Sequence, residues 1–87
     1  MSYTIQFTPS ALKDLKALPA KIQRQVATHI NALAHDPRPD GVKKLKGGQN
    51  EYRIRSGDFR ILYQVFDARI VVAVVRIADR KNAYWDR

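Results

Sequence analysis

The N-terminal part of the chain changes from the alternating pattern of a strand to the spacing of two helices. Apolar and polar positions alternate over residues 3–7, which predicts a strand with one buried face made by Tyr3, Ile5 and Phe7. Thr8-Pro9-Ser10 then offers a hydroxyl cap and a proline for a first helix, whose apolar stripe ends before Pro19 and consists of Ala11, Leu12, Leu15 and Leu18. Pro19 lies in the first turn of a second helix, predicted from about Ala20 to Ala34, with its stripe at Ile22, Val26, Ile30 and Leu33. These two helices form a hairpin.

The stretch from Tyr52 to Asp67, YRIRSGDFRILYQVFD, is typical of a β-hairpin. Two runs rich in aromatic and β-branched residues flank Gly57-Asp58, and a pair that begins with glycine suits a two-residue turn of the primed type. This turn sets a register in which the facing pairs are Ser56 with Phe59, Arg55 with Arg60, Ile54 with Ile61, Arg53 with Leu62, and Tyr52 with Tyr63.

The predicted register separates the side chains of the hairpin onto two faces, because alternate residues of a strand point to opposite sides of the sheet. The face that needs a core consists of Tyr52, Ile54, Phe59, Ile61, Tyr63 and Val65. The other face consists of Arg53, Arg55, Arg60, Leu62, Gln64 and Phe66. Its three arginines, the arginine cluster, repel one another and gain nothing for folding. The cluster is either a polyanion site or the solvated side of an antiparallel sheet.

Two further segments complete the predicted sheet. Asp36 to Asn50 is rich in proline and glycine, which predicts a connection that runs along the domain with Leu45 as its anchor. Ile70 to Ile77 is apolar at almost every position, so this strand belongs in the middle of the sheet. It pairs antiparallel with the second strand of the hairpin through the turn at Asp67-Ala68-Arg69, and the face taken by Arg76 stays open.

Together these elements predict an α+β fold in a single domain over residues 1–87. An antiparallel β-sheet carries the N-terminal helical hairpin packed on one face, and the arginine cluster lies on the face left open.

Composition restricts the possible partners and chemistry. Sixteen Lys and Arg against eight Asp and Glu give a net charge of +8, which indicates an acidic partner such as nucleic acid. The chain has no cysteine and only two histidines, His29 and His35, which we assign structural roles; no metal site and no cofactor are expected. No apolar run approaches the roughly 20 residues that span a bilayer, and no secretory signal opens the chain, so we expect no membrane partner and a cytoplasmic location.

Two basic segments could extend the arginine cluster. Lys43, Lys44 and Lys46 lie in the predicted connection, where lysines are either solvated or line a groove that follows a nucleic-acid backbone. The tail from Ala78 to Arg87 carries cations and two aromatic rings: Arg80, Lys81, Tyr84, Trp85 and Arg87. The rings either stack on the bases of single-stranded RNA or fold back onto the sheet as a hydrophobic plug.

A set of motifs over nearly the whole chain supports a comparison with a known family. The motifs are Leu45-Lys46-Gly47, Tyr52-Arg53-Ile54-Arg55, Gly57-Asp58-Phe59-Arg60-Ile61-Leu62-Tyr63, and Arg80 with Tyr84 four residues on. In this order, after a strand and a helical hairpin, they resemble the RelE/ParE superfamily of bacterial toxins, on the RelE side.

The resemblance implies the toxin of a type II toxin–antitoxin system, a ribonuclease that cuts mRNA in the ribosomal A site. It implies a RelB-like antitoxin with an acidic segment that wraps the toxin, and binding of the complex to operator DNA through that antitoxin. It implies that Arg53, Arg55, Arg60, Arg80 and Tyr84 act on the substrate, with Lys43, Lys44, Lys46 and Lys81 as further RNA contacts.

The implied chemistry is 2′-OH attack on the adjacent phosphorus, which needs no metal if side chains neutralise the developing charge. Guanidinium groups do this well but transfer protons poorly. Some RelE enzymes carry lysines where this chain has Arg53 and Arg55, so the general base is unassigned. Asp79 stands where many relatives carry histidine, and it is either a base or the ion-pair partner of Arg76 or Arg80.

Two other classes stay open from the sequence. A ParE-like toxin shares the fold and inhibits DNA gyrase by protein contact. A non-catalytic nucleic-acid-binding module has the same charge and the same salt dependence without cutting the strand.

Overall fold

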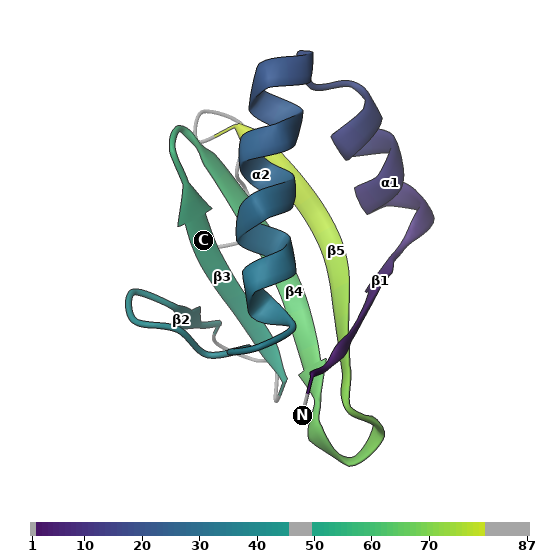
Figure 1. Ribbon diagram of the computed structural model, residues 1–87, viewed down its shortest axis with the longest axis vertical. Helices are drawn as coiled ribbons and strands as arrows, with labels where there is room; N and C mark the ends of the chain where they lie inside the picture. The colour runs from purple at the N-terminus through teal and green to yellow at the C-terminus, as the bar shows by residue number, and fades with distance from the viewer. Residues whose placement is uncertain (1, 46–49, 80–87) are drawn as a thin grey trace.

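The protein forms one β-sheet with two helices, seen here in a computed structural model that describes residues 2–45 and 50–79. The strands are β1 (Thr4–Phe7), β2 (Lys43–Lys44), β3 (Glu51–Ser56), β4 (Phe59–Phe66) and β5 (Val71–Asp79), and the helices are α1 (Pro9–Lys16) and α2 (Ala20–Leu33). The strand order is β1-β5-β4-β3-β2, and α2 lies across one face of this sheet while α1 lies beside β5 (Figure 1). No helix in this described part is long and apolar enough to span a bilayer.

The sheet is mixed, which refines the prediction of an antiparallel sheet. Neighbouring strands from β2 to β5 are antiparallel, whereas β1 pairs with β5 in parallel, from Thr4 opposite Val71 to Phe7 opposite Val74. Both helices and strands β2, β3 and β4 lie between β1 and β5 in the chain, and together they provide the long connection that a parallel pair of strands requires. Because β5 has neighbours on both sides, its predicted place inside the sheet is confirmed.

The predicted register of the β3–β4 hairpin is confirmed at every facing pair, including Arg55 opposite Arg60. Gly57 has φ of 59°, in the left-handed region that glycine enters without a steric penalty. An alanine β-carbon there would also lie 3.1 Å from the side-chain nitrogen of Gln25 on α2. The glycine therefore serves both the tight turn and the close approach of α2.

The core lies between α2 and the sheet, as the apolar patterns predict. Its largest fully buried apolar side chains come from α2 and from alternate positions of β4 and β5: Val26, Ile30, Leu33, Ile61, Tyr63, Val65, Val72 and Val74. Tyr52 also belongs to this core, and Ile54 and Phe59 pack against it half-buried. The predicted core face of the hairpin is thus confirmed.

Helix α1 covers the edge of β5 rather than the face of the sheet. The Thr8 hydroxyl accepts a hydrogen bond from the Ala11 amide, as a helix cap does, and donates to the carbonyl of Val75. The Asp14 carboxylate accepts hydrogen bonds from the Ile77 amide and from the Arg76 side chain. Arg76, whose face the sequence left open, therefore points toward α1. This edge position gives α1 a narrow contact, so only Ala11 of its predicted stripe is fully buried.

Three predicted burial positions differ in the structure. Leu12 is 40% exposed because α1 packs at the sheet edge, and Phe7 is 36% exposed because it ends the edge strand β1. Leu62 is buried, although the register places it beside Arg53 on the arginine face. That face is therefore not open along its whole length, contrary to the prediction.

The connection predicted from Asp36 to Asn50 contains the short strand β2. Its two residues extend the sheet beyond β3, with Lys43 opposite Arg53 and Lys44 opposite Tyr52. A lysine pair has no apolar alternation, so the hydrophobic pattern does not indicate this strand. The consequence is that Lys43 is held on the sheet rather than in a free loop.

Candidate functional site

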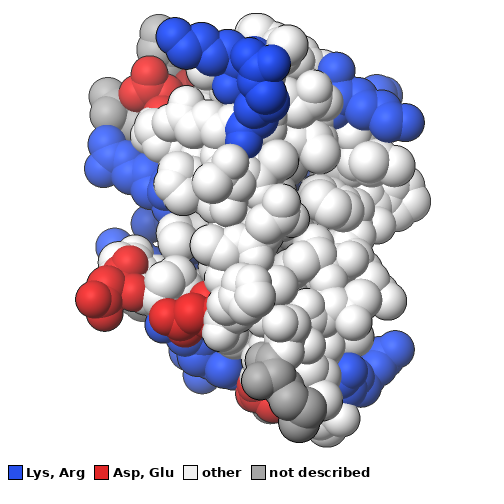
Figure 2. Space-filling view, in the orientation of Figure 1, with Lys and Arg blue, Asp and Glu red and all other residues white. Residues whose placement is uncertain are grey.

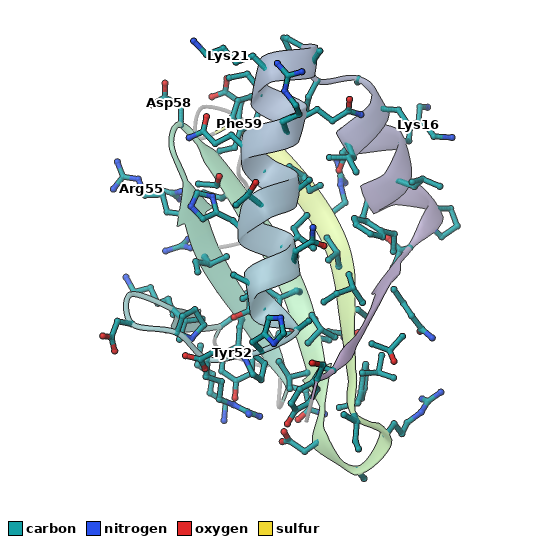
Figure 3. The ribbon with its side chains drawn as sticks, viewed as in Figure 1. Lys16, Lys21, Tyr52, Arg55, Asp58 and Phe59 are labelled. Atoms are coloured by element: carbon teal, nitrogen blue, oxygen red, sulfur yellow. The ribbon has the colours of Figure 1, made fainter. Side chains whose placement is uncertain are left out.

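The arginine cluster lines an open cleft of about 400 Å³ at the edge of the sheet. Arg53 and Arg55 alternate on β3, and Arg60 faces Arg55 from β4, so the three side chains leave the same face. The wall opposite them comes from the segment before β2 and its first residue: Gly41, Val42 and Lys43. The Arg55 side chain projects outward beside β3, at the edge of the sheet (Figure 3).

The structure brings together four of the nine predicted site residues. Arg53, Arg55, Arg60 and Lys43 share the cleft. Lys44 is not among its lining residues, because it lies one position along β2, opposite Tyr52. The other predicted contacts, together with Trp85, fall outside the described residues: Lys46, Arg80, Lys81 and Tyr84.

Three arginines and one lysine line one concave surface, which makes it a candidate anion site. Arg55 is exposed, while Arg53 and Arg60 are half-buried. All three belong to strands β3 and β4, so their guanidinium groups are held by regular secondary structure. The face that bears α2 differs, because its centre is uncharged and its Lys and Arg side chains lie around the rim (Figure 2). A polyanion is therefore expected at the cleft.

The described lining of the cleft contains no carboxylate, histidine or tyrosine. Guanidinium groups bind and orient phosphate and stabilise charge, but they do not exchange protons near neutral pH. Lys43 carries the one lining amine. Asp79 lies half-buried at the end of β5, opposite Phe59, and is not part of this lining. The described part of the site supplies binding and charge stabilisation, and the general base remains unassigned.

A second polar cluster, which the sequence did not indicate, lies next to the segment that forms the wall of the cleft. Arg38 donates from both terminal nitrogens to Asp67, at 3.2 and 2.8 Å, and from Nε to the Tyr52 hydroxyl at 2.9 Å. Its guanidinium carbon lies 5.2 Å from the centroid of the Tyr52 ring. The Tyr3 hydroxyl donates to the same carboxylate at 2.7 Å. We call Arg38, Asp67, Tyr52 and Tyr3 the Arg38 clamp.

The electrostatics of the Arg38 clamp follow from these contacts. Hydrogen bonds from Arg38 and then from Tyr3 lower the pKa of Asp67. The hydrogen bond that Arg38 donates to Asp67 raises the pKa of Arg38. The separate hydrogen bond that Tyr3 donates to Asp67 is the main cause of the raised pKa of Tyr3. Asp67 and Arg38 therefore stay charged, and Tyr3 stays neutral, across the physiological range of pH.

His29 ties α2 to the tip of the hairpin. Its Nδ1 shares a hydrogen bond of 2.5 Å with the hydroxyl of Ser56, which is only 2% exposed. His35 is exposed, and its Nδ1 lies 3.5 Å from the hydroxyl of Ser2. Neither histidine lines the cleft, which agrees with the structural roles expected for both.

A comparison with known proteins shows which family has this fold and sequence. Residues 5–84 match the sequence model of the ParE toxin family of type II toxin–antitoxin systems, parDE. The chain belongs to the RelE/ParE toxin superfamily. The resemblance noted from the hairpin motifs is confirmed by this match.

Within the superfamily, the similar proteins carry RelE names. The putative toxin RelE1 of Methanocaldococcus jannaschii is 35% identical over 88 residues, covering 97% of each chain. The mRNA interferase toxin RelE of Escherichia coli is 31% identical over 85 residues, covering 95% of this chain and 88% of the relative. The RelE of the archaeal RelE–RelB complex from Pyrococcus horikoshii superposes with a TM-score of 0.82 at 28% identity, covering 95% of this chain and all of that one. The chain is a RelE-like toxin of a toxin–antitoxin system.

Proposed function

We propose that this toxin is an endoribonuclease that cuts mRNA in the ribosomal A site and so stops translation. The observation that carries the proposal is the cleft itself, in which three arginines and Lys43 converge from two strands and the adjoining β2. The relative from E. coli named an mRNA interferase supports the same assignment. A ribosome-dependent enzyme of this kind would act in the cytoplasm.

The cleft suits a reaction in which RNA supplies its own nucleophile. The 2′-oxygen attacks the adjacent phosphorus, the bond from phosphorus to the 5′-oxygen breaks, and a 2′,3′-cyclic phosphate and a 5′-hydroxyl result. The phosphodiester already carries one negative charge and a second develops in the phosphorane; Arg55 and Arg60, facing each other across the hairpin, are suited to neutralise this dianion. Arg53 and Lys43 would hold the flanking phosphate and keep the strand aligned. This route requires no metal.

Proton transfer has to come from outside the described lining of the cleft. Tyr84 is our proposed participant, because it follows Arg80 by four residues in the motif that resembles the RelE side of the superfamily. Asp79 is the alternative base, near the cleft end of β5. The ribosome would contribute by holding the mRNA in an in-line geometry, which lowers the demand on the toxin's own acid and base.

We further propose that a RelB-like antitoxin silences the toxin by covering the cleft with an acidic segment. The RelE from P. horikoshii was solved as a complex with RelB, which supports a partner of this type. A net charge of +8 favours carboxylates on the partner. The toxin–antitoxin complex would bind operator DNA through the antitoxin.

A second function has one observation in its favour, because the matching family model is that of ParE toxins. A ParE-like toxin would inhibit DNA gyrase by protein contact and would have no use for a phosphate-binding cleft of arginines. The cleft therefore favours the nuclease over the gyrase inhibitor.

Cell-free translation followed by primer extension on the message separates the candidates. A nuclease leaves new 5′ ends at codon positions, and only while ribosomes translate. A gyrase inhibitor leaves the message intact and blocks supercoiling in a parallel assay with purified gyrase. A nucleic-acid binder without activity does neither, although it retards RNA with the same salt dependence. A message that stays intact while the toxin arrests translation in the extract would overturn the proposal.

A further inference from the structure

We infer that Arg38 is a positioning residue of the site, because the Arg38 clamp fixes the wall of the cleft that faces the arginines. The inference rests on the proposed function, because it takes the cleft to be the RNA-binding site. Arg38 itself does not line the cleft, so it is not a catalytic residue.

The wall segment is anchored just before it reaches the cleft. The buried Tyr63 hydroxyl donates to the carbonyl of Pro37 at 2.7 Å, and the next residue is Arg38, held by Asp67 and Tyr52. Only Pro39 and Asp40 separate this anchor from Gly41, the first residue of the wall. Two successive residues are thus tied to the sheet by side chains of β3, β4 and the turn that follows β4.

Beyond the anchor, the chain has limited freedom before it joins the sheet. The Val42 amide donates to the carbonyl of Pro39 at 3.1 Å, and Lys43 then pairs with Arg53. Strand β2 has only two residues, so its own ladder holds the wall weakly. The Arg38 clamp therefore supplies the restraint that so short a strand lacks.

The same contacts connect the clamp to the arginine strand. Tyr52 accepts from Arg38 through its hydroxyl, lies opposite Lys44 through its backbone, and precedes Arg53 in β3. Its ring also stacks on that of Tyr63, with centroids 5.9 Å apart. Movement of Arg38 would shift both the wall and the strand that carries two of the three arginines.

The geometry explains why arginine occupies this position. The side chain makes a bidentate contact with one carboxylate and a third hydrogen bond to a hydroxyl, which a lysine ammonium cannot reproduce. The pair is partly exposed, with side-chain exposures of 38% for Arg38 and 57% for Asp67. An isolated exposed pair contributes little, so the restraint depends on the whole network and not on the ion pair alone.

The decisive test is Asp67→Asn in the full-length toxin, with binding of a fluorescein-labelled single-stranded RNA measured by anisotropy. This substitution removes a negative charge, so an electrostatic effect without positioning tightens RNA binding. Loss of the clamp should instead weaken RNA binding, because the wall of the cleft is no longer fixed. We expect the dissociation constant to rise roughly threefold or more, which corresponds to the lower end of the coupling energies found within one network. Tighter or unchanged RNA binding overturns the inference.

Two further variants separate positioning from charge and from folding. Arg38→Gln should weaken RNA binding more than Arg24→Gln, a matched control that removes the same charge from the exposed surface of α2. Tyr3→Phe removes one hydrogen bond of Asp67 without a change of charge, and it decides the question if Asp67→Asn fails to fold. Two results would overturn the inference. One is equal weakening of RNA binding by Arg38→Gln and Arg24→Gln, and the other is a Tyr3→Phe variant whose Val42 amide exchanges at the parent rate in the measurement described next.

Hydrogen exchange gives a readout that does not depend on the nuclease. In Arg38→Gln and Tyr3→Phe the Val42 amide should exchange faster, while amides of the β4–β5 ladder keep the parent rates. If the parent cut no message in the translating extract, the proposed function would fall while the clamp could still be established in this way. Unchanged protection of Val42 in either variant would refute the clamp even if the nuclease were proven.

Discussion

Replacement of His29 by alanine should destabilise the fold although the residue lies outside the cleft. The Ser56 hydroxyl is almost fully buried and shares its hydrogen bond with His29 Nδ1. Removing one partner leaves a buried polar group without that bond, which costs about 1–3 kcal/mol. In a domain of this size each kcal/mol lowers Tm by about 4–8 °C.

A thermodynamic cycle tests this assignment by urea denaturation and calorimetry. Ser56→Ala should cost less than His29→Ala, because a half-buried imidazole can still meet water while a buried hydroxyl cannot. The double variant should be more stable than the sum of the two single effects predicts, since no orphaned hydroxyl remains. His35→Ala is the matched control, and this exposed residue should change stability by no more than about 0.5 kcal/mol.

Two results would refute the reasoning. One is a free energy of unfolding of His29→Ala within about 0.5 kcal/mol of the parent, which is the range of surface substitutions. The other is strict additivity of His29→Ala and Ser56→Ala, since that would show that the two side chains do not interact.

The remaining predictions concern acid, the tail and the partner. The pKa of Asp67 is lowered in the folded protein by the hydrogen bond from Arg38. The ionised Asp67 therefore stabilises the fold fully above its unfolded-state pKa of about 3.9, and this contribution is lost as the pH falls through the lower folded-state pKa. The Tm difference between the parent and Asp67→Asn should therefore shrink below about pH 4, and a difference that grows there contradicts the clamp. Tyr84→Phe should keep most RNA binding but slow single-turnover cleavage, whereas Tyr84→Ala should lose both; a Phe variant at the parent rate rules out a role of the hydroxyl in the chemical step. Association with an acidic antitoxin segment, followed by stopped flow, should slow as ionic strength rises from about 0.05 to 0.5 M, and a rate independent of salt argues against charge steering.

The parts of the fold that the sequence predicts well are those determined by local pattern. The hairpin register follows from Gly57-Asp58 and from the alternation around it, so the amino-acid sequence alone predicts that Arg55 faces Arg60. The helices follow in the same way, α1 from its Thr8 cap and both helices from the spacing of their apolar residues. The arginine part of the cleft is therefore accessible from sequence.

The parts that the sequence does not predict depend on contacts between distant residues. Arg38 and Asp67 are 29 positions apart, and Tyr3 and Asp67 are 64 apart, so no periodicity connects them. Strand β2 forms because the edge of β3 is available to pair with it, and two lysines carry no strand signal of their own. This pairing is what brings Lys43, but not Lys44, to the cleft.

The exposure of Leu12 and Phe7 and the burial of Leu62 have the same origin. Binary patterns assign a face to each residue, yet the depth of burial depends on whether another element lies over that face. Helix α1 packs against the β5 edge through Thr8 and Asp14, which leaves Leu12 outside the contact. Such an arrangement is a property of the assembled sheet.

The most direct test of the account compares the parent with Arg60→Ala in a translating extract, with the 5′ ends of the message mapped by primer extension. Arg60 lines the cleft and faces Arg55, so its loss should abolish codon-positioned cleavage, and thermal unfolding measured alongside shows that the variant is folded. Arg24→Ala, an equal loss of charge on α2, should cleave like the parent. Parent-like cleavage by a folded Arg60→Ala variant would contradict the central claim that the arginine cleft is the site of RNA cleavage.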